Sequence, residues 1–79
     1  MNRRDEIYSL CAKELSLILE VDQDSIIHST NFADLGLDSA MAVHFILAVE
    51  DKLRIELDPD VLERHTNLDS FCAYLADRL

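Results

Sequence analysis

Apolar residues recur at three- and four-residue steps in the first quarter of the chain, with polar residues between them. They are Ile7, Leu10, Cys11, Leu15 and Ile18. Steps of this size place side chains on one face of an α-helix. The strict alternation of apolar and polar positions that is typical of half-buried strands is nearly absent from the sequence. The pattern therefore predicts a helix over about residues 4–20.

A polar stretch rich in Asp, Ser, Thr and Asn follows over residues 21–36, "VDQDSIIHSTNFADLG". This composition predicts a long loop. Ile26, Ile27, Phe32 and Leu35 inside it are apolar. We expect these side chains to hold the loop against the core.

A second helix is predicted from a cap at Asp38 to about Leu53. The Asp38 carboxylate can accept hydrogen bonds from the free amides of the first turn and complements the helix dipole. Only His44 is polar among residues 40–49. The helical period assigns five residues to an inward stripe: Ala42, Phe45, Ile46, Val49 and Leu53.

Two further helices are predicted in the last third of the chain. Asp58 and Pro59 match the cap and first position of a short helix that ends near Arg64 or His65, since proline has no N–H to leave unpaired there. The run from Thr66 to Asp69 resembles a capping box, and the last helix carries an apolar stripe of Leu68, Phe71, Cys72, Leu75 and Leu79. The predicted fold is an all-α, small four-helix bundle with three longer helices, a short third helix and a long loop between the first two.

Composition narrows the class of protein. A chain of 79 residues with 49% hydrophobic residues fits one small folded domain over residues 1–79. Seven Lys and Arg against sixteen Asp and Glu give a formal charge of −9, which argues against binding to nucleic acid or an anionic membrane surface. We expect the free protein to be a monomer.

The N-terminal residues, the apolar runs and the two cysteines indicate a cytoplasmic protein. The start "MNRRDEIYSL" lacks the apolar core of a signal peptide, and no apolar run is long enough to span a bilayer. Cys11 and Cys72 form no disulfide-rich or metal-binding pattern. We interpret both as small buried hydrophobes in a reducing compartment.

Ser39 is predicted at the first helical position after the only glycine of the chain, Gly36. Glycine lets the backbone turn sharply and deliver the chain to the helix start. A side chain at a helix N-terminus is exposed at the end of the bundle, where free amides favour a phosphate group. The plainer interpretation is a serine that only favours the local turn.

The segment "DLGLDS", residues 34–39, resembles the modification motif of acyl carrier proteins, and Phe32 fits the same motif. The order of helices and the long loop resembles that family over nearly the whole chain. The resemblance implies that Ser39 carries a covalent 4′-phosphopantetheine, moved from coenzyme A by a separate phosphopantetheinyl transferase. It also implies that Asp38 contacts the metal of that transferase, that the cargo is a thioester of the cofactor, and that the carrier itself catalyses nothing.

The second helix departs from the family where partners are expected to bind. The residue after the serine is Ala40 in place of the usual Leu, and acids appear only at Glu50 and Asp51. We expect partners to dock mainly through apolar contacts with one set of residues: Ala40, Met41, Val43, His44 and Leu47, followed by Glu50 and Asp51. The sequence leaves open whether Val43 and Leu47 are exposed or buried.

The letters "GLDS" favour a polyketide-type carrier. The expected function is to hold an acyl or aminoacyl group for enzymes of polyketide or related specialised biosynthesis, such as antibiotic biosynthesis. Its partners would be an acyltransferase or an acyl or aminoacyl ligase, and a synthase or downstream transferase. Carriers of fatty-acid or nonribosomal peptide synthesis are the alternatives, and an unmodified helical interaction adaptor is the alternative from another class.

Other chemistry fits poorly. A serine hydrolase needs G-x-S-x-G, but the glycine stands three residues before Ser39 and Met41 occupies the second glycine position. A calcium loop would need glycine in place of Ile27 and glutamate in place of Ala33. The three histidines, His28, His44 and His65, lack the spacing of metal ligands.

Overall fold

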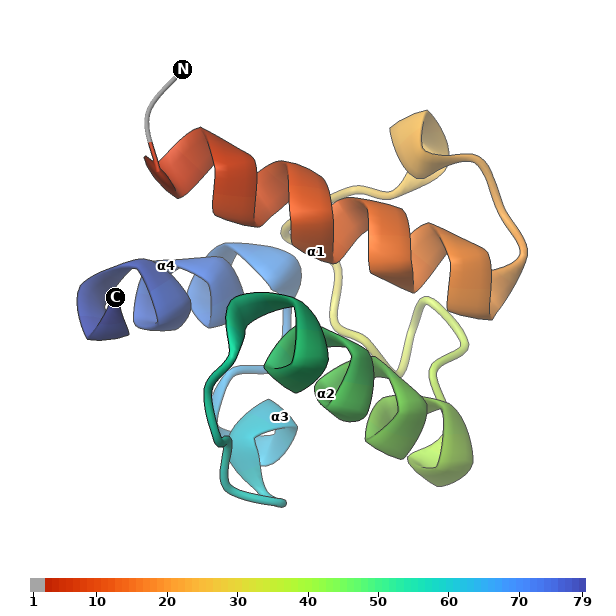
Figure 1. Ribbon diagram of the computed structural model, residues 1–79. Helices are drawn as coiled ribbons and strands as arrows, with labels where there is room; N and C mark the ends of the chain where they lie inside the picture. Colours follow the sequence, from red (N-terminus) through yellow and green to blue (C-terminus); the bar gives the residue numbers. More distant parts are fainter. Residues whose placement is uncertain (1–2) are drawn as a thin grey trace.

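The structure is a computed structural model that describes residues 3–79. Its helices are α1 (Arg3–Leu19), α2 (Ser39–Leu53), α3 (Val61–Arg64) and α4 (Leu68–Arg78), with a 3-10 turn, η1 (Gln23–Ser25), in the long loop (Figure 1). Strands are absent from this part of the chain. The all-α prediction of three longer helices and one short helix is confirmed. None of the helices within residues 3–79 is both long and apolar enough to cross a lipid bilayer.

The core lies where α1 crosses α4 and α2 (Figure 1). It takes Ile7, Cys11 and Leu15 of the predicted α1 stripe, with Leu10 and Ile18 half-buried against it. It also takes the first four stripe residues of α4 and the inner face of α2. The buried side chains are Ile7, Cys11, Ala12, Leu15, Ile26, Phe32, Phe45, Ile46, Val49, Leu57, Val61, Leu68, Phe71, Cys72 and Leu75. The three- and four-residue periodicity of the sequence therefore predicted the helix-borne core correctly.

An aromatic cluster holds the long loop against the helices. Phe32 is 5% exposed, and its ring centroid lies 5.8 Å from that of Phe45 and 6.4 Å from that of Phe71. The Phe45 and Phe71 centroids are 5.5 Å apart. The backbone N–H of Phe32 also donates to the carbonyl of Thr66 at 2.8 Å. All three phenylalanines of the chain thus join the loop to α2 and α4.

The loop prediction was wrong at one residue. Ile26 is buried and Leu35 is half-buried, but Ile27 is 65% exposed. Ile26 has an extended backbone, and successive side chains of an extended chain point to opposite sides. Because Ile26 points into the core, Ile27 points out.

The third helix begins later than predicted. Its N-cap is Asp60, and Asp58 and Pro59 precede the helix in a turn in which the Asp58 carbonyl accepts from the Val61 N–H at 3.1 Å. The Asp58 carboxylate does not cap the helix but pairs with Arg64 at 2.9 Å. This ion pair and the turn account for the two-residue shift.

The last helix also differs at its ends. Its N-cap is Asn67, whose side-chain oxygen accepts from the Ser70 N–H at 2.8 Å, so the predicted capping box from Thr66 to Asp69 does not form. The Thr66 carbonyl instead accepts a hydrogen bond from the Phe32 N–H. Leu79 lies past the end of α4 and is 41% exposed, so its assignment to the buried stripe was wrong.

The two cysteines meet in the core between α1 and α4. Cys11 and Cys72 are both free and fully buried, as predicted. A hydrogen bond to the Cys72 thiol, together with burial, raises the pKa of the Cys11 thiol. Because the thiolate is the reactive form of cysteine, Cys11 is unreactive in the folded chain.

Candidate functional site

The segment before α2 is a tight hydrogen-bonded turn. The Gly36 N–H donates to the Ala33 carbonyl at 3.1 Å, and the Leu37 N–H donates to the Phe32 carbonyl at 3.0 Å. Gly36 has φ +96°, and a Cβ built on it meets nothing within 4 Å. The turn therefore needs glycine for its backbone conformation and not for lack of space.

Asp38 and Ser39 begin α2 as the sequence predicted. Asp38 is the N-cap, and its Oδ1 accepts from the Met41 N–H at 2.8 Å. Ser39 is the first helical residue and is exposed. Oδ2 of Asp38 and the hydroxyl of Ser39 make no hydrogen bond with the described residues. No base of the described chain therefore activates the Ser39 hydroxyl.

A groove leads away from Ser39 along α2. Its first hollow has a volume of about 420 Å³ and is lined by Asp38 and Ser39, by Ala42, Val43 and Ile46 of α2, and by Asn31, Phe32, Ala33, Leu37, Pro59, Leu62, Glu63 and Thr66. A second hollow of about 210 Å³ is lined by Val43, Ile46, Leu47, Glu50, Leu57 and Pro59. The two hollows share Val43, Ile46 and Pro59. They form one groove between α2 and the segment around α3, with Ser39 at one end and Glu50 at the other.

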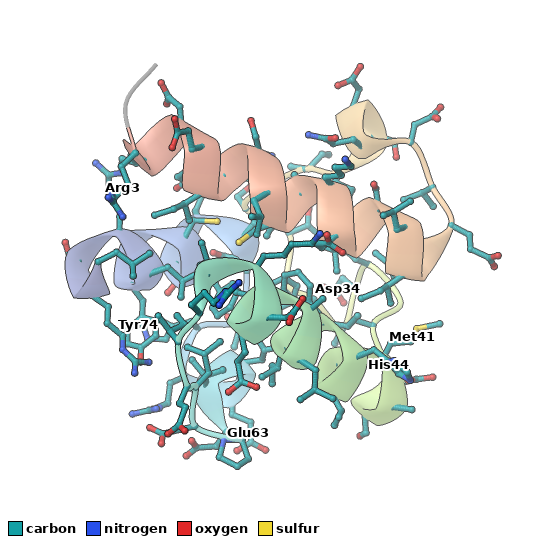
Figure 2. The ribbon with its side chains drawn as sticks, viewed as in Figure 1. Arg3, Asp34, Met41, His44, Glu63 and Tyr74 are labelled. Atoms are coloured by element: carbon teal, nitrogen blue, oxygen red, sulfur yellow. The ribbon has the colours of Figure 1, made fainter. Side chains whose placement is uncertain are left out.

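The outward face of α2 carries the apolar residues whose exposure the sequence left open. Val43 is 55% exposed and Leu47 is 56% exposed. Ala40 and His44 are also exposed, whereas Met41 is half-buried. Figure 2 shows the Met41 and His44 side chains projecting from the first half of α2.

The two acidic residues on the second half of α2 have different surroundings. Asp51 is exposed. Glu50 is half-buried, and its Oε2 accepts from the Leu57 backbone N–H at 2.7 Å. Of the predicted partner-binding residues, Val43, Leu47 and Glu50 line the groove, and Glu50 is also bonded within the molecule. The others do not line it; they are Ala40, Met41, His44 and Asp51.

The far wall of the groove was not found from the sequence. It consists of Leu57, Pro59, Leu62 and Glu63, which precede α3 or belong to it. Such short stretches carry too few turns to show which face is apolar, and their contact with α2 depends on the path of the connection. The proline and the two leucines were the only signals available.

Metal ligation finds no support in the geometry. Within residues 3–79 no group of three or more His, Cys, Asp or Glu side chains is arranged to hold a metal ion. His28 stacks on Tyr8 with ring centroids 5.5 Å apart, and His65 stacks on Tyr74 at 4.7 Å. His28 thus packs against a tyrosine of α1 and His65 against a tyrosine of α4, and neither histidine lines the groove.

The family described as "Phosphopantetheine attachment site" has a model that matches residues 10–75. An acyl carrier protein of Lactobacillus acidophilus is 35% identical over 72 residues, covering 90% of each chain. One of Guillardia theta is 31% identical over 75 residues, covering 94% of this chain and 93% of its own. The Polyketide synthase PksN of Bacillus subtilis is 25% identical over 76 residues, which cover 96% of this chain but 1% of the synthase.

Two solved structures share the fold. A free-standing peptidyl carrier protein of Acinetobacter baumannii superposes with a TM-score of 0.89 at 21% identity, covering 95% of this chain and 94% of its own. The HMG-ACPI domain of the CurA module of Lyngbya majuscula gives a TM-score of 0.88 at 25% identity, covering 98% of this chain and 78% of that domain. The arrangement of four helices and a long loop is therefore that of carrier domains.

Proposed function

The chain belongs to the family of acyl carrier proteins, which bear a phosphopantetheine attachment site and catalyse no reaction, and from this premise we propose that it holds an acyl or aminoacyl intermediate as a thioester on a phosphopantetheine bound to Ser39. Residues 1–79 act as one carrier domain in this proposal. A separate phosphopantetheinyl transferase forms the phosphodiester between the cofactor and the Ser39 hydroxyl, with coenzyme A as the donor. The working thiol is that of the cofactor.

The observation that carries the assignment to Ser39 is its position at the exposed first turn of α2, within the matched residues 10–75. The free amides of this turn and the helix dipole favour a phosphodiester there. The hydroxyl has no base among the described residues, which agrees with a modification performed by another enzyme. Cys11 and Cys72 are buried and so do not compete with the cofactor thiol for the acyl group.

Asp38 can perform two tasks at once. Its Oδ1 accepts a hydrogen bond from the Met41 N–H, which leaves Oδ2 to contact the metal of the transferase. Carboxylate oxygens are good ligands for hard cations such as Mg²⁺. Asp38 therefore orders the first turn and takes part in the modification of its neighbour.

The groove gives the arm a surface to lie on. It begins at Ser39 and is lined mainly by apolar side chains, so an apolar acyl group can leave water along it. The groove is open along its length, which suits a carrier that must release its cargo to partner enzymes.

Partner enzymes dock on the outward side of α2. The surface consists of Ala40, Met41, Val43, His44 and Leu47, with Glu50 and Asp51 at its end. Val43 and Leu47 are more than half exposed, and exposed apolar side chains in one patch are typical of protein interfaces. The partners include the transferase, an acyltransferase or an acyl or aminoacyl ligase, and a synthase or downstream transferase.

The pathway proposed is polyketide or a related specialised biosynthesis, including that of antibiotics, in the cytoplasm. The "GLDS" motif favours it, and the similarity to a segment of the polyketide synthase PksN agrees with it. Carriage of fatty-acid or peptide intermediates is the alternative. Acyltransferases and ligases of known specificity, offered the loaded protein in parallel, would separate these pathways.

The modification is tested by intact mass. After incubation with coenzyme A and a promiscuous transferase, the protein should gain one phosphopantetheine. Ser39→Ala should gain none, whereas Ser29→Ala, which alters another exposed serine, should gain it as the natural protein does. Failure of the natural sequence to gain mass with several transferases would favour an unmodified helical adaptor.

Apolar docking is tested with the same transferase as the partner. Leu47→Asp should raise its KM by about tenfold, because a buried, unpaired charge disfavours an apolar interface. Leu17 of α1 is 63% exposed, so Leu17→Asp makes the same change on a different helix and should leave the KM unaltered. Equal KM values for the two variants would refute docking through α2.

A further inference from the structure

One side-chain hydrogen bond joins α2 to the connection at the far end of the groove. The Glu50 carboxylate, half-buried on the second half of α2, accepts from the Leu57 N–H at 2.7 Å. A short bond to an ionised acceptor is among the stronger hydrogen bonds of proteins. Within residues 3–79 it is the only side-chain hydrogen bond between α2 and the connection to α3.

The bonded segment forms a wall of the groove. Leu57 lines the second hollow, and Pro59 lines both hollows. The backbone here is irregular, and the Leu57 N–H makes no backbone hydrogen bond. Asp58 joins the wall to α3 through its ion pair with Arg64 and its turn to Val61. Against α2, the wall is held by the Glu50 carboxylate and by burial of the Leu57 side chain, without a helix or strand ladder.

We propose that Glu50 is the positioning residue of the groove. Its carboxylate holds the Leu57–Pro59 wall against α2 and so determines whether an apolar acyl group, attached to Ser39 through phosphopantetheine, is shielded from water. The proposal rests on the proposed function, since the acyl group must be carried on Ser39. Ser39 and Glu50 are eleven helical residues apart, or about 16 Å along the axis at 1.5 Å per residue. The acyl group is attached at the end of the phosphopantetheine arm, so an octanoyl chain offers apolar surface for the groove wall to cover, whereas an acetyl group offers almost none.

Glu56 provides a matched control. It precedes Leu57 in the connection and is also a glutamate, but its side chain is exposed, lines neither hollow of the groove and makes no hydrogen bond or ion pair with the described residues. A role that depends on acidity alone, such as attraction of a basic partner, would be shared by Glu50 and Glu56. A role that depends on the bond to Leu57 belongs to Glu50 alone.

The experiment compares how fast a thioester is lost to an added thiol. The natural protein and its variants are loaded with octanoyl- or acetyl-phosphopantetheine, using the acyl-coenzyme A and a promiscuous transferase. Excess 2-mercaptoethanol then attacks the thioester carbonyl, which releases the cofactor thiol and forms the acyl mercaptoethanol. Each rate is divided by that of the same acyl-coenzyme A, and intact mass confirms loading.

We expect the natural protein to slow the loss of octanoyl but not of acetyl. Glu50→Ala should accelerate octanoyl loss by about tenfold, which corresponds to about 1.4 kcal/mol, and leave acetyl loss unchanged. Glu50→Gln keeps a side-chain oxygen that can accept from Leu57, so it should restore most of the protection. Glu56→Ala should behave as the natural protein does.

Amide hydrogen exchange at Leu57 shows whether the wall itself has opened. The exchange rate should rise in Glu50→Ala and not in Glu56→Ala. Should Glu50→Ala fail to fold, Glu50→Met removes the acceptor and keeps the aliphatic bulk, and it should give the same acceleration.

The proposal is overturned if octanoyl is lost at the natural rate without the Glu50 carboxylate, or if octanoyl and acetyl are accelerated equally. It is also overturned if the natural protein gives octanoyl no protection. A failure of every variant to gain mass would instead reject the proposed modification, and it would be seen before any thiol is added.

Discussion

The side of the molecule where α1 meets α4 differs in construction from the side where α2 faces α3. At the first, two regular helices of 17 and 11 residues bury complementary stripes and fully enclose both cysteines. At the second, a helix with exposed Val43 and Leu47 faces a four-residue helix and an irregular connection. The space between them remains an open groove with Ser39 at one end.

This difference assigns the stability of the fold to one side of the molecule and the binding of cargo and partners to the other. The α1–α4 side can supply most of the free energy of folding because its apolar side chains are removed from water. The α2–α3 side leaves apolar surface uncovered, which contributes little to folding and is available to cargo and partners. Phe32 links the two sides, since it fixes the loop that leads to Ser39 against both α2 and α4.

The largest contrast between the sides is expected when the same residue type is truncated on each. Leu15 of α1 is fully buried, and Leu15→Ala should lower the free energy of unfolding by about 2–5 kcal/mol. Leu47 of α2 is 56% exposed, and Leu47→Ala should change it by about 0.5 kcal/mol or less. Urea denaturation of the unmodified protein measures both, and equal losses would refute the contrast.

The α1–α4 side should also respond to alkaline pH. The pKa of the Cys11 thiol is raised in the folded state, so the unfolded chain loses its proton first, above the ordinary thiol pKa of about 8.5. The contribution of Cys11 to stability is complete below that pH and decreases above it, by up to about 1.4 kcal/mol per pH unit. Urea midpoints between pH 7.5 and 9.5 should fall less steeply in Cys11→Ala, and parallel curves would exclude Cys11 as the cause.

On the α2–α3 side, changes at Asp38 should separate stability from modification. Asp38→Ala removes the cap of α2 and should cost about 1 kcal/mol. Asp38→Asn keeps a capping oxygen, so its stability should stay within about 0.3 kcal/mol while its kcat/KM with the transferase falls by about tenfold or more. If Asp38→Asn were loaded at the natural rate, Asp38 would act only as a cap.

The smallest changes in stability are expected at residues whose backbone adopts the left-handed conformation. Gly36 has φ +96°, and Gly36→Ala should cost about 1 kcal/mol through conformation alone. Arg54 ends α2 with φ 58° and is not glycine, so Arg54→Gly should stabilise the protein by about 0.5–1 kcal/mol. Thermal unfolding measures both, and only Gly36→Ala should also slow the modification of Ser39.

The sequence predicted regular helices well and contacts between irregular segments poorly. Leu15 and Phe71 could be assigned to the core because a helical period repeats over several turns. The Asp38 cap and Ser39 at the helix start could be predicted because capping depends on neighbouring residues. The start of α3 could not, because the Asp58–Arg64 ion pair competes with the cap.

The groove depends on contacts that no local pattern encodes. Its far wall comes from residues 57–63, which meet α2 only because of the path of the connection and the bond from Glu50 to Leu57. Glu50 itself was predicted to be a partner-binding acid because it follows an apolar face. Its half-buried hydrogen bond became visible only in three dimensions.

The most direct test compares backbone amide chemical shifts of the protein before and after phosphopantetheine is added. We expect the changes to concentrate at residues 36–47 and 57–66, which surround Ser39 and the groove, and to leave the outer face of α1 unchanged. Changes spread equally over α1 and α4, or a modification that leaves residues 36–47 undisturbed, would contradict the division between a stabilising side and a presenting side.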